Sequence, residues 1–385
     1  MPSGRFGGSP TRWVPLGLLG ALVLIALVER HVDQHPLDYL GGSHWSYKVA
    51  SRVAEAGSEG DQVLCFGDSL LRLGLAPTAL EAESGLRGYN FAQSGGQAPG
   101  SYFLLRRALN SGAKPSAIVV DFFPRLLAEN PSFNNDNWPF LADLRDSFGL
   151  ALLARKPEMF ARLATRLALP SARSRISLRA NVRLALQPGP VSIKHEILKS
   201  IHNWKVNRGA EITASRPGLV EDVDAWERGY FSGFHCSRIN RAYVEKFLDL
   251  AASHQIPVFW LLPPYQPALQ GRCERSGFDA EHEAFVRGFL PRYPGLFVLD
   301  ARRSGYQPEV FYDLHHLGRE GASVLSADVG EAIRRWRGES SSQNQWVALP
   351  GYHPRPDATP LEDVDQSRMV VWKEIQAGRV TNPRR

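Results

Sequence analysis

A serine lies directly after the first apolar segment that has the character of a strand. The tetrapeptide Gly67–Leu70 reads Gly-Asp-Ser-Leu and follows the apolar residues Val63–Phe66. In an open parallel sheet, ligands bind at the carboxyl ends of the strands, so Ser69 stands where a reaction could occur. If a helix begins at this serine, its backbone N–H points toward an anion that forms there. The sequence therefore predicts a nucleophile at Ser69, with an ordinary helix N-cap as the alternative.

A carboxylate and two imidazoles lie near the other end of the chain, in the segment Tyr312–Gly318. A serine hydroxyl is a poor nucleophile near neutral pH, so it needs a base, and the base needs a third group that fixes its tautomer. Asp313 and His316 are three residues apart, on a turn that leads into a helix, and we expect them to fill these roles. His315 is the alternative base. The same residues could bind a metal, but no further ligand stands at suggestive spacing, so we expect none.

The chain between these motifs has the pattern of an α/β domain, which we expect to span residues 60–337. Short apolar runs alternate with helical segments, which predicts β-α-β units and a parallel sheet. The last two runs are continuous rather than alternating, which indicates strands covered on both faces. The expected strands are 62–66, 89–92, 117–122, 257–262 and 296–300, and the expected later helices are 237–254, 279–290 and 319–336.

Two long segments lack this alternation of short apolar runs and helical segments. Between about 124 and 226, Arg, Leu and Ala dominate, and we expect a helical insertion. It could pack on the core as a lid or satellite, or lie on a membrane surface as a basic amphipathic helix. The segment 338–385 is rich in Ser, Pro, Gln and charge, so we expect a polar C-terminal tail of low order.

The N-terminus predicts a membrane anchor within residues 1–35. Arg5 and Arg12 precede an apolar run over residues 13–28. As a helix this run covers about 24 Å, slightly less than the hydrocarbon core, so a cleaved secretory signal is the competing interpretation. No Ala-x-Ala-like site follows, which favours an uncleaved anchor. The basic flank would stay in the cytoplasm, so we expect the remaining chain outside it, in a periplasmic or extracellular location.

The composition argues against some partners. The chain has 385 residues, of which 43% are hydrophobic, and 45 basic against 39 acidic residues give a net charge of +6. Its basic residues are not gathered with aromatics into a stripe, so we expect no nucleic-acid partner. Three cysteines, Cys65, Cys236 and Cys273, are too few for a disulfide scaffold, although Cys236 and Cys273 could pair in an oxidising compartment.

The two motifs resemble the first and last conserved blocks of the SGNH, or GDSL, hydrolase superfamily. The resemblance implies a three-layer α/β/α flavodoxin-like sandwich and a serine esterase or acyltransferase with Ser69, Asp313 and His316 as its catalytic residues. The segment Asn90–Gly96 is similar to the family's second block, which implies that Gly95 donates to the oxyanion together with the backbone of Ser69. No cofactor is expected.

The family's third block is missing in recognisable form. It usually reads Gly-x-Asn-Asp and supplies an Asn donor to the oxyanion, whereas Val120–Arg125 stands in its place here. Loss of one such donor costs about 3 to 4 kcal/mol of transition-state stabilisation, so we expect a replacement. The candidates, each of which could equally be an ordinary loop residue, are Asn130, Asn134, Asn135 and Asn137.

This departure is similar to that of membrane-associated, export-side members of the superfamily, including relatives of alginate O-acetyltransferases. We therefore expect hydrolysis or transfer of an ester-linked acyl group, with acetyl on a glycan as the preferred substrate and a small ester as another. The two reactions share an acyl-serine and differ in whether water or a sugar hydroxyl attacks it. Two alternatives stay open: a catalytically weak carbohydrate-binding or assembly subunit, and a lipase-like esterase acting on membrane lipids.

Overall fold

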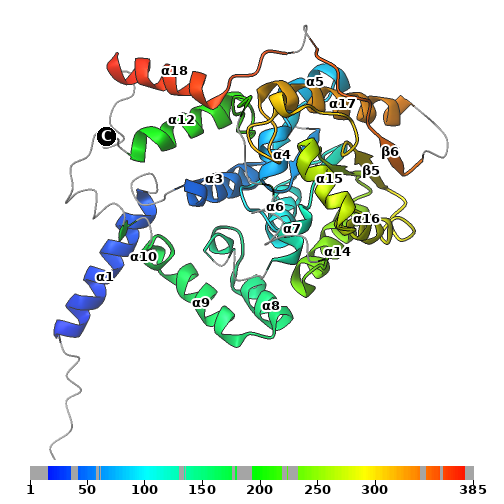
Figure 1. Cartoon of the computed structure of the whole chain (residues 1–385). Helices are drawn as coiled ribbons and strands as arrows, with labels where there is room; N and C mark the ends of the chain where they lie inside the picture. Colours follow the sequence, from blue (N-terminus) through cyan, green and yellow to red (C-terminus); the bar gives the residue numbers. More distant parts are fainter. Residues whose placement is uncertain are drawn as a thin grey trace, which may run out of the picture.

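Figure 1 shows the computed structural model of the chain. It describes residues 16–35, 42–57, 60, 62–129, 134, 136–175, 178–179, 193–218, 223, 233–338, 344–355 and 359–377. Six parallel strands form one sheet in the order β2-β1-β3-β4-β5-β6. They are β1 (Val63–Phe66), β2 (Gly88–Asn90), β3 (Ala117–Val120), β4 (Val258–Leu262), β5 (Leu296–Asp300) and β6 (Trp346–Ala348). The predicted α/β class with a parallel sheet is confirmed, and the first five strands follow the flavodoxin-like order.

Alternate side chains of each central strand enter two separate hydrophobic cores. Leu64 and Phe66 of β1 lie in one core, and Val63 and Cys65 lie in the other. Helices therefore cover both faces, an arrangement compatible with a three-layer sandwich. The Leu64 face is covered by α3 (Gly42–Ala56), α6 (Ala98–Asn110), α14 (Arg238–Ser253) and α16 (Phe278–Arg287). The opposite face is covered by α4 (Ser69–Gly74), α5 (Pro77–Ser84) and α17 (Arg319–Gly338).

The described chain between β3 and α14 is largely helical, as predicted for the insertion. Asp143 and Asp146 form a reciprocal capping box that starts α8, and a proline at the first position starts α9. Side chains of both helices, Leu150 and Leu163, join the core on the Leu64 face of the sheet. The helices are α7 (Pro124–Ala128), the 3-10 helix Trp138–Phe140, α8 (Leu144–Ala154), α9 (Pro157–Ala168), α10 (Pro170–Arg173) and α12 (Ile193–Val206).

The segment after residue 338 differs from the low-order tail that the sequence predicts. β6 extends the sheet by pairing with β5, and Trp346 Nε1 donates to Asp300 Oδ2 at 3.2 Å. Farther on, α18 (Val364–Gln376) packs against α12 (Figure 1). The prediction was wrong because β6 has only three residues, all of them exposed or half-buried, so no apolar run reveals the strand.

The described part of the predicted anchor is α1 (Leu16–Gln34). Apolar side chains along it, including Leu24 and Leu27, are exposed. Among the residues that the structure describes, which begin at residue 16, no helix combines the length and the apolar character needed to span a bilayer. The start of the predicted apolar run, residues 13–15, lies outside the described residues. The anchor therefore stays a prediction.

The cysteines are free thiols in the structure. The Cys236–Cys273 disulfide, which the sequence left open, is not formed. Cys273 is buried in a small apolar cluster with Tyr265 and Phe278, whereas Cys236 packs at the edge of the core on the Leu64 face. The two residues thus belong to different packing environments.

Candidate active site

The predicted nucleophile is the first residue of helix α4, directly after β1. Asp68 is the N-cap, and its Oδ1 accepts a hydrogen bond from the Leu70 N–H at 2.8 Å. Gly67 has a φ of +150°, and a Cβ there would lie 1.5 Å from Asp121 Oδ1. Only glycine fits this turn, which fixes where the hydroxyl of Ser69 emerges from the sheet.

Folding brings the serine, the histidine and the aspartate of the two motifs together. His316 Nε2 lies 2.8 Å from Ser69 Oγ, and His316 Nδ1 lies 2.6 Å from Asp313 Oδ2. When Nδ1 carries the proton and donates it to the carboxylate, Nε2 is free to accept the serine proton. The fold thus places a hydroxyl, an imidazole and a carboxylate in one row, although Ser69 and His316 are 247 positions apart in the sequence.

The loop that carries the histidine is closed by its own backbone. Phe311 and Leu317 form an antiparallel bridge at its base. Asp313 Oδ1 accepts from the backbone N–H groups of His315 at 3.0 Å and His316 at 2.8 Å. One carboxylate therefore shapes the turn with one oxygen and orients the imidazole with the other.

The charges in this loop favour an ionised aspartate. Burial would raise the pKa of Asp313, but its hydrogen bond to His316 and the neighbouring histidines hold the pKa well below its usual range. Burial, followed by the charge of His316, lowers the pKa of His315 to about 3, so this second histidine is neutral near pH 7. Its ring stacks on Phe123 at 5.7 Å. Of the two candidate bases, His316 is the one that bonds to Ser69.

A second carboxyl pair lies behind the serine, and sequence reasoning missed it. Asp68 and Asp121 are both buried, and the Asp68 N–H donates to Asp121 Oδ1 at 3.0 Å. Asp68 Oδ2 accepts from the Phe123 N–H at 3.0 Å. Burial raises the pKa of Asp68 to about 6, while burial and the neighbouring Asp68 raise the pKa of Asp121 well above its ordinary value. The pKa of both carboxyl groups is thus raised, which favours the proton-bound form of the pair. The available signal was the position of Asp121 directly after β3, at the same sheet edge as Ser69.

The glycine loop after β2 packs against the turn that carries the serine. The Gln93 N–H donates to Gly67 C=O at 3.0 Å, and a Cβ on Gly96 would lie 2.5 Å from that oxygen. Gly95 has a φ of +66°. Within the described part of the chain, the backbone N–H groups of Gly95 and Ser69 have no hydrogen-bond acceptor. Both predicted oxyanion donors thus remain available for a ligand.

The asparagines proposed as a third donor have another use where the structure describes them. Asn134 is buried, and its Nδ2 donates to Gly95 C=O at 2.7 Å and to Gln97 Oε1 at 3.3 Å. Asn137 Nδ2 donates to Asn134 Oδ1 at 2.8 Å. Asn134 therefore supports the glycine loop, and its amide hydrogens are not free for an oxyanion. Asn130 and Asn135 lie outside the described residues.

The loop residues Asp313, His315 and His316 could also offer one ligand atom each to a metal, because these atoms lie within 4.8 Å of one another. In the observed arrangement both nitrogens of His316 are already engaged, one by Asp313 and one by Ser69. A metal would have to break these bonds, and would then have three protein ligands. The geometry suits proton transfer better than metal binding.

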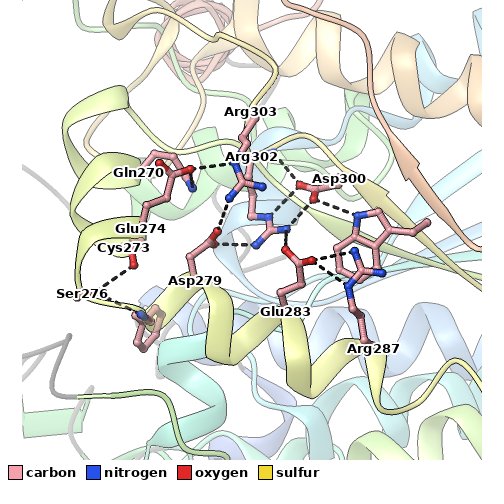
Figure 2. Close-up of polar contacts among 12 residues, drawn as sticks. Gln270, Cys273, Glu274, Ser276, Asp279, Glu283, Arg287, Asp300, Arg302 and Arg303 are labelled. Atoms are coloured by element: carbon pink, nitrogen blue, oxygen red, sulfur yellow. Dashed lines mark hydrogen bonds and ion pairs between the residues drawn. The ribbon is translucent and has the colours of Figure 1, made fainter.

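A buried arginine fixes the elements beside the site (Figure 2). Arg302 follows β5, and its side chain is only 3% exposed. Its guanidinium contacts Asp300 at 2.6 Å, Asp279 at 2.8 Å and Glu283 at 2.9 Å. These bonds join the end of β5 to α16, whose first residue Phe278 packs with Leu314 of the histidine loop. The ion-pair network thus holds α16 in place, and α16 packs against the histidine loop through Phe278 and Leu314.

Neither a scan against protein-family models nor a search of curated proteins finds a match to this chain. A functional proposal for this chain therefore rests on the arrangement of Ser69, His316 and Asp313.

Proposed function

We propose that the protein is a serine esterase or acyltransferase of the SGNH type. The observation that carries the proposal is the 2.8 Å contact between Ser69 Oγ and His316 Nε2, in line with the 2.6 Å contact between His316 and Asp313. A hydroxyl in reach of an imidazole whose other nitrogen is held by a carboxylate is the arrangement used for nucleophilic acyl transfer. The parallel sheet and the order of the two motifs along the chain support the SGNH fold.

The proposed reaction has two halves. Ser69 Oγ attacks the ester carbonyl as its proton passes to His316 Nε2, and the ionised Asp313 stabilises the resulting imidazolium. The backbone N–H groups of Ser69 and Gly95 bind the oxyanion. When the tetrahedral intermediate collapses, the leaving alcohol takes the proton from His316. Water or a sugar hydroxyl then attacks the acyl-serine and gives its proton to His316. As the bond between the acyl carbon and Ser69 Oγ breaks, His316 returns this proton to Ser69, and the acid or the new ester leaves.

For the substrate we propose an acetylated glycan outside the cytoplasm, reached by a domain that an N-terminal segment tethers to the membrane. The resemblance to export-side members of the superfamily and the exposed apolar residues of α1 support this choice. A panel of acetylated xylan, p-nitrophenyl acetate and phospholipid tests it. Turnover of phospholipid without turnover of either acetyl ester would favour the lipase-like alternative.

Covalent labelling tests the nucleophile. A fluorophosphonate should label the native protein, and Ser69→Ala should abolish the labelling. Ser116→Ala is the matched control, because this serine is exposed directly before β3, so the variant should label as the native protein does. A folded native protein that takes up no label would contradict the enzyme proposal and favour a binding or assembly role.

A further inference from the structure

Helix α8 presents a row of apolar side chains to solvent. Leu144, Phe148 and Leu152 are 58%, 59% and 67% exposed. They are spaced by four residues, so they lie on one face of the helix. Leu150, on the opposite face, enters the core. Single exposed apolar residues are ordinary, but a row of three large ones indicates an interaction surface.

Basic side chains surround this row. Arg145, Arg155, Lys156 and Lys246 are all exposed. In the described part of the chain, none of the four has an ion-pair partner. Arg145 and Lys246 also line an open groove that Phe148 borders. The row is therefore apolar in the middle and cationic at its rim.

The nearby acidic groups do not cancel this charge. Asp146 is paired with Arg106 at 2.5 Å and takes part in the capping box of α8. Asp143 caps the N-terminus of the same helix, where its charge meets the helix dipole. Glu158 is a further exposed acid, at the start of α9. Within the described chain, four cations without an ion pair, against Asp143 and Glu158, leave the surface positive.

A series of helices in contact connects α8 to α1, the helix with exposed apolar side chains. α8 packs on α9, α9 on α10, and α10 on α1. Glu29 of α1 accepts from the backbone N–H of Ser171 at 2.7 Å, and Arg173 contacts Asp33 at 3.1 Å. In Figure 1, α1, α9 and α8 lie in the lower part of the molecule, whereas α4 lies in the upper part.

We propose that this face docks on an anionic lipid bilayer. We call it the α8 surface, and it consists of Leu144, Phe148, Leu152, Arg145, Arg155, Lys156 and Lys246. Its apolar row would enter the boundary between headgroups and acyl chains, while the rim cations contact anionic headgroups. A second copy of the chain is a poor occupant, because two such surfaces would bring like charges together. Docking would hold α4, and with it Ser69, away from the bilayer.

A fluorophore at residue 148 of the full chain tests the proposal. Phe148→Cys, made in a Cys236→Ser background so that no half-buried thiol competes, is labelled with an environment-sensitive dye. The chain is reconstituted in vesicles of phosphatidylglycerol and phosphatidylethanolamine that contain doxyl-labelled lipid. We expect a blue-shifted emission that the doxyl lipid quenches. The readout does not depend on esterase activity, so it can fail or succeed independently of the proposed enzyme.

Met369→Cys on α18 is the matched control, because Met369 is 61% exposed on a helix that lies far from α8 in Figure 1. A dye at 369 should be neither shifted nor quenched. If the dye at 148 behaves like the dye at 369, the proposal is overturned. Shielding at 148 that appears only when native membranes replace pure lipid would also overturn it, since a protein partner would then cover the surface.

Charge variants test the rim. Replacing Arg145 and Lys246 by Gln should shift the ratio of docked to undocked chains about fivefold per charge removed. The control replaces Arg337 on α17 and Lys373 on α18 by Gln, which removes the same charge elsewhere. An equal response of the two pairs would contradict a specific α8 surface.

Discussion

The carboxylate of Asp313 has two tasks that can be separated by substitution. One oxygen accepts backbone N–H groups and shapes the loop, and the other holds His316 Nδ1. Asp313→Asn keeps the size of the side chain but can present an N–H to the imidazole, which selects the wrong tautomer for accepting the Ser69 proton.

We therefore expect Asp313→Asn to slow fluorophosphonate labelling by about 10³- to 10⁴-fold. Its melting temperature should change little, because Oδ1 can still accept the backbone N–H groups. Ser116→Ala is the control, because it changes an exposed residue outside this loop. A rate within tenfold of the native value would argue against the orienting role of Asp313.

The raised pKa of Asp121 predicts how stability depends on pH. Its raised folded pKa means that the native protein binds the proton more tightly than the unfolded chain does. The resulting contribution to the free energy of unfolding is fully present below about pH 4, and it is lost as pH rises through the folded-state pKa of Asp121. Asp121→Asn keeps an oxygen for the Asp68 N–H but does not titrate. The variant should therefore lose less stability than the native protein between pH 5 and 8.

Urea unfolding at several pH values measures this difference. Asp121→Leu is the matched variant, because it removes the acceptor of the Asp68 N–H and should destabilise by about 1–3 kcal/mol at every pH. Parallel pH profiles for the native protein and Asp121→Asn would contradict a protonated Asp121.

For single residues, the sequence predicted which side chains meet but not which residues support them. It singled out Ser69, Asp313 and His316, because nucleophilic chemistry requires those residue types, and the structure brings the three side chains together. It could not show that the pKa of Asp121 is raised, because that shift comes from burial and from the neighbouring Asp68, both of which depend on the fold. Nor could it show that Asn134 supports Gly95, since that contact joins loops 39 residues apart.

Among the elements, the glycine loop after β2 packs closely against the turn that carries Ser69. A Cβ on Gly96 would meet two backbone oxygens, Gly67 O at 2.5 Å and Gln93 O at 2.9 Å, and a backbone cannot yield as a flexible side chain does. Gly96→Ala should therefore push the loop from the turn that carries Ser69.

We expect Gly96→Ala to reduce the labelling rate by about 10²-fold or more, the effect of losing one oxyanion donor. Gly100→Ala is the matched control, because its Cβ would meet side chains at the ordinary distances of 3.6 and 3.9 Å. Labelling kinetics and a crystal structure of both variants would test this. Native kinetics in Gly96→Ala would show that the loop does not serve the site.

Elements with strong periodicity were predicted closely, and those without it were missed. β5 has the expected bounds, and α14 and α17 differ from the expected helices by one or two residues at an end. The apolar residues of α14 and α17 recur with the helix period because one face of each enters a core. β5 is instead a continuous apolar run, because its alternate side chains enter the two cores. β6 has no such face, since its pairing rests on backbone bonds and on Trp346.

For the whole molecule, the sixth strand predicts that the C-terminal segment is part of the folded unit. Leu349, Leu361 and Val371 are buried, and the first two belong to the core that contains α5 and α17. Ending the chain at Gly338 would remove these side chains and expose the outer edge of β5. The lost burial amounts to about 5 kcal/mol, which is comparable to the whole stability of many domains.

We therefore expect the chain that ends at Gly338 to be largely unfolded or aggregated, both because its core is incomplete and because an uncovered strand edge invites pairing. Circular dichroism, light scattering and fluorophosphonate labelling would measure this. Two point variants test whether the buried side chains of this segment matter more than its exposed ones. Leu349→Ser should destabilise the protein because Leu349 is buried, whereas Val347→Ser should not, because Val347 is exposed on β6. A truncated chain that folds and labels like the native protein would show that the first five strands form the site without their C-terminal neighbour.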